Sequence, residues 1–110
     1  MIAAAMIEDS TAVPEWGVYE LPHLREWRRY AVVTLRELAQ AAGVSYATLR
    51  FVEMGRARTR GRKVTRLADA LGVPAPVLIT YGPQDREAHQ WAAPAALHGA
   101  AIRAASMSRP

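Results

Sequence analysis

The spacing of apolar residues along the middle of this 110-residue chain predicts a series of short helices. Leu24, Trp27 and Ala31 recur at intervals of three and four positions with charged residues between them, as on the buried face of a helix. No segment alternates apolar and polar residues for long enough to predict a strand. The same helical spacing returns in three later groups, at Leu35, Leu38, Ala39 and Ala42, at Leu49 and Val52, and at Val64, Leu67, Ala68 and Leu71.

Start and stop signals set the boundaries of these helices. The first should end near Val32–Val33, because Thr34 and Glu37 have the spacing of a capping box that begins the second. Gly43 can end the second helix in a left-handed conformation, and Ser45 can cap the third. The third helix then covers about Tyr46–Met54, a loop covers Arg56–Arg62, the fourth helix covers 64–71, and a last short helix runs through Leu78 and Ile79. We therefore expect an all-α fold, a compact bundle of about five short helices.

Composition excludes several classes of protein. The chain has no cysteine, so a disulfide scaffold, a thiol nucleophile and a zinc-finger site are ruled out. His23, His89 and His98 are scattered and accompany no catalytic or metal-binding motif. We expect no enzyme activity, no cofactor and no metal. No apolar run approaches the ~20 residues that span a bilayer, which favours a cytoplasmic protein without a membrane partner.

Charge is distributed unevenly along the chain and suggests three segments. The formal net charge is +4. Residues 1–20 carry only acids and read as an N-terminal arm that could fold back over a basic face, while residues 21–80 hold most of the bases. Arginine binds phosphate through two parallel hydrogen bonds, so the densest basic cluster favours nucleic-acid contact, although a solvated loop would have the same composition. This cluster consists of Arg56, Arg58, Arg60, Arg62, Lys63 and Arg66.

Residues 81–110 form an alanine- and proline-rich tail with isolated apolar anchors at Trp91, Leu97 and Ile102. The sequence leaves open whether this tail is partly disordered or forms helices. If helical, it could support dimerisation or bind a partner protein.

Residues 34–55 read TLRELAQAAGVSYATLRFVEMG, which is the pattern of a helix-turn-helix. Two capped helices flank a turn that contains Gly43, and Ala39 is small where the helices should cross. In this motif the second helix places its N-terminal outward residues in the DNA major groove, which is ~12 Å wide.

The sequence resembles the lambda-repressor-like, Cro-type helix-turn-helix family (the XRE group) over about Leu24–Ile79. The resemblance is carried by L-R-E-W-R-R, T-x-x-E-L-A, A-G-V-S-x-A-T-L-x-x-V-E-x-G and R-L-A-D-A-L-G-V-P. It implies a small transcriptional regulator, a repressor, that binds double-stranded DNA. We expect a homodimer on a palindromic site, because one such module offers few base contacts. The resemblance also implies an ion pair between Arg28 in the first helix and Glu53 at the end of the third.

The outward residues of the third helix are the candidates for base contacts. Arg50 can donate to guanine O6 and N7, and Ala47 and Phe51 can pack against thymine methyl groups. Tyr46 can donate to a base or a phosphate. Phe51 could instead pack on the N-terminal arm or on a partner chain.

Phosphate contacts are expected from the helix caps and the basic cluster, and they position the protein without reading sequence. The family commonly has Gln after the cap of its second helix, where this chain has Leu35, so Arg36 is the substitute. The family also commonly has Gly at the position of Val32. The full set of expected phosphate contacts is Thr34, Arg36, Ser45, Arg56, Arg58, Arg60, Arg62 and Lys63.

Two other functions remain open from the sequence. V-S-Y-A-T-L-R-F-V-E also resembles the MerR-type DNA-binding regulators, although the wing and the long coiled-coil helix of that family do not follow here. An antitoxin or adaptor would use the same fold to bind a partner protein through residues 81–110. Such a module has no need of six bases within residues 56–66.

Overall fold

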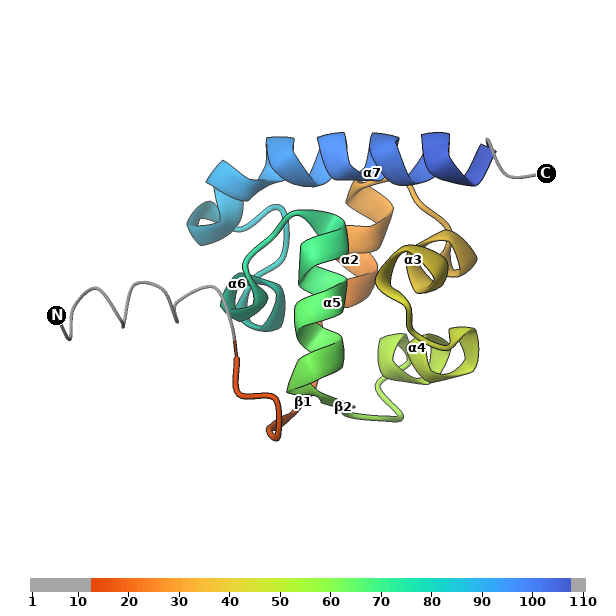
Figure 1. The fold of residues 1–110 in the computed structure, drawn as a ribbon. Coiled ribbons are helices and arrows are strands. Elements are labelled where there is room, and N and C mark those ends of the chain that lie inside the picture. The colour runs from red at the N-terminus through yellow and green to blue at the C-terminus, as the bar shows by residue number, and fades with distance from the viewer. Residues whose placement is uncertain (1–12, 108–110) are drawn as a thin grey trace, which may run out of the picture.

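A computed structural model describes residues 13–107, which form a helical bundle with one small antiparallel sheet (Figure 1). The predicted all-α bundle is confirmed. Within the described residues, no helix is long and apolar enough to cross a membrane. The elements in chain order are β1 (Val18–Tyr19), α2 (Leu24–Tyr30), α3 (Leu35–Ala42), α4 (Tyr46–Glu53), β2 (Thr59–Arg60), α5 (Gly61–Leu71), α6 (Ala75–Thr80), the 3-10 helix η1 (Arg86–Trp91) and α7 (Ala92–Met107).

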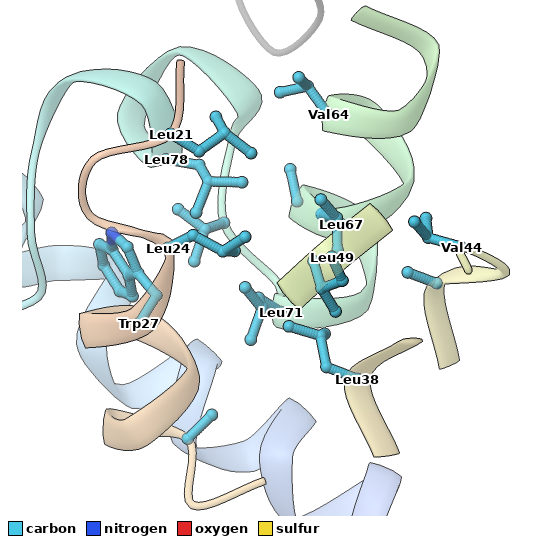
Figure 2. Close-up of a cluster of buried hydrophobic side chains, with 14 of the residues drawn as sticks. Leu21, Leu24, Trp27, Leu38, Val44, Leu49, Val64, Leu67, Leu71 and Leu78 are labelled. Carbon is cyan, nitrogen blue, oxygen red and sulfur yellow. The ribbon is translucent and has the colours of Figure 1, made fainter. Parts of the chain in front are cut away.

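Helix α5 lies at the centre of the bundle and packs against α3, α6 and α7 (Figure 1). Figure 2 shows Leu38 and Leu49, from α3 and α4, close to Leu67 and Leu71 of α5. Trp27 is the largest fully buried side chain. Its indole Nε1 donates to the carbonyl oxygen of Tyr81 over 2.7 Å, so the one polar atom of this ring is satisfied inside the core.

The helix-turn-helix has the local geometry that its sequence predicts. The Thr34 hydroxyl accepts from the backbone of Glu37, and the Glu37 carboxylate accepts from the backbone of Thr34, which completes the capping box. Gly43 ends α3 with φ of 68°, and the Ser45 hydroxyl caps α4 by accepting from the Thr48 amide. The predicted boundaries of α3 and α4 are therefore confirmed to within one residue.

An ion pair between α2 and α4 fixes the end of α4. Arg28 Nε donates to Glu53 Oε2 over 2.6 Å, and Arg28 Nη2 donates to Glu53 Oε1 over 3.0 Å. Arg28 Nη1 also donates to the carbonyl oxygen of Val33, which lies in the turn before α3. The Glu53 side chain is only 3% exposed, so its charge depends on these donors.

The end of the first helix differs from the prediction. The sequence places it near Val32–Val33, whereas α2 ends at Tyr30 with Ala31 as its cap. Val32 has φ of 59°, which is a left-handed conformation that a β-branched residue rarely adopts. The reason is the chain reversal between α2 and α3, which requires a left-handed residue at the position where the family commonly has Gly.

The structure corrects the prediction that the chain contains no strand. β1 pairs antiparallel with β2, with Val18 opposite Arg60 and Tyr19 opposite Thr59. Two-residue strands are too short to show an alternating pattern, so sequence periodicity could not reveal them. Helix α5 also begins earlier than expected, so Arg62 lies in its first turn and not in a loop.

Residues 92–107 form one continuous helix, α7, which packs against α2, α3 and α5. Leu97 is not an anchor as expected, because it is 71% exposed. The contact is made by Ala95 and Gly99 instead: a Cβ on Gly99 would lie 2.0 Å from the carbonyl oxygen of Ala31, so only a small residue allows this approach. Arg103 Nη1 then donates to the carbonyl oxygens of Ala31 and Val32.

Replacing Val32 with Gly should stabilise the protein by about 1 kcal/mol. Glycine removes the left-handed strain, which exceeds the entropy that glycine adds to the unfolded chain. Val32 is 64% exposed, so little buried area is lost. The measurement is the urea midpoint at constant m value. The matched control, Val33→Gly, removes a buried side chain and should destabilise the protein, and a loss of stability in Val32→Gly would contradict the interpretation.

Replacing Arg28 with Met should destabilise the protein by about 3 kcal/mol, because it leaves the Glu53 carboxylate buried without its main partner. Urea unfolding of Arg28→Met, of Glu53→Leu and of the double variant measures the coupling between the two residues. The double variant should recover part of the loss. Arg25, which also approaches Glu53 but is 48% exposed, provides the control: Arg25→Met should cost less than about 1 kcal/mol.

Candidate nucleic-acid interface

One side of α4 presents a row of uncovered side chains. Tyr46, Ala47, Arg50, Phe51 and Met54 are all exposed, whereas the inward residues of the same helix are buried. Large hydrophobic side chains stay uncovered at a cost in free energy, so a cluster of them marks a contact surface. Helix α4 lies at the end of the bundle opposite α7 (Figure 1), and its outer row is exposed in the described part of the chain.

The N-terminal end of α4 brings together residues that the sequence predicted as separate DNA contacts. The Arg36 guanidinium lies over the Tyr46 ring, 4.9 Å from its centroid, which is a cation–π contact between the first turns of α3 and α4. Thr34 and Ser45 are exposed at the starts of these two helices. Each hydroxyl accepts a backbone N–H as a cap, and its own hydrogen can still be donated to a ligand.

The basic cluster follows α4 along the chain. Arg56 and Arg58 lie in the loop after α4, Arg60 lies in β2, and Arg62 and Lys63 lie in the first turn of α5. The four arginines are exposed, and Lys63 is half-buried. The cluster therefore continues from the C-terminal end of α4 to the central helix.

The described part of the acidic arm lies beside this cluster. The Arg58–Glu20 and Arg62–Glu15 ion pairs have N–O distances of 3.4 and 3.9 Å. All four side chains are about two-thirds exposed, so these pairs are weak and a stronger anion can displace them. Glu8 and Asp9, the other acids of the arm, lie outside the described residues.

Two arginines of α2 belong to the same surface, and sequence reasoning missed them. Arg25 and Arg29 line a hollow of about 370 Å³ between α2 and α4, together with Arg50 and Met54. Their four-residue spacing on the outer side of the first helix was visible in the sequence. Only the folded structure places that side next to α4.

His23 and its neighbours serve the fold. His23 Nδ1 lies 2.7 Å from Glu26 Oε1, and the Gln84 amide donates to the other oxygen of Glu26. The hydrogen bond with His23, and after it the one from Gln84, lowers the pKa of Glu26, so this carboxylate is ionised at neutral pH. Through its hydrogen bond with Gln84, Glu26 joins α2 to the segment after α6. Between residues 13 and 107, no group of three or more histidines and acids could hold a metal ion.

Comparison with known proteins assigns the fold to a family. The helix-turn-helix domain family matches residues 23–79, the segment that runs from the cap of α2 through α6. No curated protein and no solved structure matches the chain. The matched residues make up more than half of the sequence, and they contain the ion pair, the capped α3–α4 unit and the exposed row on α4. The chain therefore belongs to the helix-turn-helix domain family, consistent with the Cro-like group, and this membership indicates DNA binding.

Proposed function

We propose that this protein is a sequence-specific transcriptional regulator, a repressor, that inserts α4 into the major groove of double-stranded DNA. The observation that carries the proposal is the uncovered row on α4 with arginines on both sides. Arg25 and Arg29 flank it on α2, and Arg56 and Arg58 flank it in the following loop. A surface with exposed apolar residues between cations suits a groove that has methyl groups at its floor and phosphates along its edges.

The dimensions of α4 suit this groove. With its side chains an α-helix is about 10–12 Å in diameter, which matches the ~12 Å width of the major groove. In a helix-turn-helix the N-terminal residues of the second helix contact the base edges, so we place Tyr46, Ala47 and Arg50 nearest to the bases. We place Phe51 and Met54 farther along the groove wall.

Base reading is assigned to four side chains. Arg50 would donate to guanine O6 and N7, and Ala47 and Phe51 would pack against thymine methyl groups. Tyr46 would present its hydroxyl to a base or a phosphate. Its ring position is supported by the stacked guanidinium of Arg36.

Phosphate contacts would form two borders around these four residues. One border consists of Thr34, Arg36 and Ser45 at the helix starts, with Arg25 and Arg29 from α2. The other border is the basic cluster, from which DNA phosphates would displace Glu15 and Glu20. Its members in this role are Arg56, Arg58, Arg60, Arg62 and Lys63.

A homodimer in the cytoplasm is the form we propose for DNA binding. One copy offers only four base-reading side chains, so two copies on a palindromic site would supply a longer recognition sequence. A second candidate function is partner binding through residues 81–110. It is favoured by the outward side of α7, where Leu97 and Met107 are 71% and 84% exposed.

Salt dependence tests the DNA-binding proposal directly. Affinity for duplex DNA should fall by about 10³-fold or more between 50 and 200 mM salt, because six or more phosphate contacts release counterions on binding. Fluorescence anisotropy with a labelled duplex measures this slope. Undetectable duplex binding at low salt would contradict the proposal and favour the partner-protein function.

Arg50→Ala and Arg58→Ala should separate base reading from phosphate binding. Arg50→Ala should relax preference at one base pair, whereas Arg58→Ala should weaken binding to all sequences and reduce the salt slope by about one. Arg86, an exposed arginine on η1, is the control, and Arg86→Ala should leave both properties unchanged. Equal losses on every sequence in Arg50→Ala would exclude its role in the groove. Affinities for a set of single-base variants of the preferred site provide the measurement.

A further inference from the structure

A cavity lies between the turn before β1 and the beginning of α5. It has a volume of about 580 Å³ and is lined by Glu15, Trp16, Arg60, Arg62, Lys63 and Arg66. This volume is in the range of small-ligand sites. The cavity thus shares three cations with the surface assigned to DNA phosphates and adds two side chains, Trp16 and Arg66, that have no part in that assignment.

The wall of the cavity that carries Trp16 is held in place by backbone contacts. β1 pairs with β2, and the Gly61 amide donates to the carbonyl oxygen of Gly17 over 2.9 Å. A Cβ on Gly61 would lie 1.9 Å from the carbonyl oxygen of Pro14, so the absence of a side chain lets the turn approach α5. These contacts hold the backbone on both sides of Trp16 beside the basic residues.

The chemistry of the cavity is that of a site for a flat aromatic anion. Four cations face one carboxylate, and that carboxylate, Glu15, forms only a long ion pair with Arg62. Arg60 and Arg62 can each donate two parallel hydrogen bonds to phosphate oxygens. Arg66 Nη1 donates to the Gly43 carbonyl oxygen over 3.5 Å, and the other N–H groups of its guanidinium can donate to the same phosphates. Trp16 is 79% exposed, so its ring has a free surface on which a planar group can stack.

We propose that this cavity binds a nucleoside phosphate, with the base stacked on Trp16 and the phosphates held by Arg60, Arg62 and Arg66. Duplex DNA offers phosphates to these arginines but keeps the faces of its bases inside the stack. A free nucleotide or an unpaired base of a single strand can use both the arginines and Trp16, which a duplex cannot. The inference does not depend on duplex DNA binding.

Calorimetric titration at low salt with adenosine diphosphate and with inorganic pyrophosphate tests the site. The two probes share a diphosphate group, so their difference reports the base. Adenosine diphosphate should bind at least fivefold more tightly than pyrophosphate, the lower end of what stacking one base contributes. Trp16→Ala should remove this difference, and Arg66→Gln should weaken both probes. Tyr30→Ala, which removes another exposed aromatic ring on α2, should change neither.

A short oligothymidylate distinguishes the two sources of the ligand. Tighter binding of the single strand than of the nucleotide, lost in Trp16→Ala, would support the site and assign it to an unpaired base. Weaker binding of the strand would support the site and assign it to a free nucleotide. Equal affinities for adenosine diphosphate and pyrophosphate, or an unchanged affinity for adenosine diphosphate in Trp16→Ala, would overturn the proposal. Duplex binding measured on the same variants shows separately whether the DNA-binding proposal holds.

Discussion

The position of α4 depends on the ion pair between Arg28 and Glu53. One guanidinium reaches both oxygens of Glu53 at the end of α4 and the carbonyl oxygen of Val33 before α3. It thereby ties together α2, the turn that enters the helix-turn-helix, and the last residue of α4. Helix α4 is only eight residues long and has just two buried residues, Leu49 and Val52, so packing alone gives it few contacts. The ion pair between Arg28 and Glu53 at the end of α4 therefore fixes the direction in which the exposed row of α4 faces.

The turn between α2 and α3 contains an unfavourable backbone conformation. Val32 adopts a left-handed conformation there, and Arg103 of α7 donates to its carbonyl oxygen and to that of Ala31. The contact places α7 across the end of α2, on the side away from α4 (Figure 1). The long C-terminal helix thus stabilises the strained turn and leaves the exposed row of α4 uncovered.

The sequence predicted those features that depend on local chemistry. Thr34, Gly43 and Ser45 set the boundaries of α3 and α4 through contacts with residues three or four positions away, so their spacing was sufficient. The features it did not predict depend on distant parts of the chain. β1 and β2 are two residues each, and they are strands only because the fold brings the two segments together to pair. Leu97 faces outward because the close contact of α7 with Ala31 is made by Gly99. Arg25 and Arg29 became part of the candidate interface only when α2 was placed beside α4.

Selection of bound sites from a random pool of duplex DNA tests the central claim that α4 reads the major groove. We expect enrichment of a palindromic sequence whose half-sites are centred about 10 base pairs apart, because the two copies of the proposed homodimer would present their α4 helices one helical turn apart. Each half-site should contain a guanine and neighbouring thymines, the partners expected of Arg50, Ala47 and Phe51. A bound pool with no enriched sequence would contradict the claim.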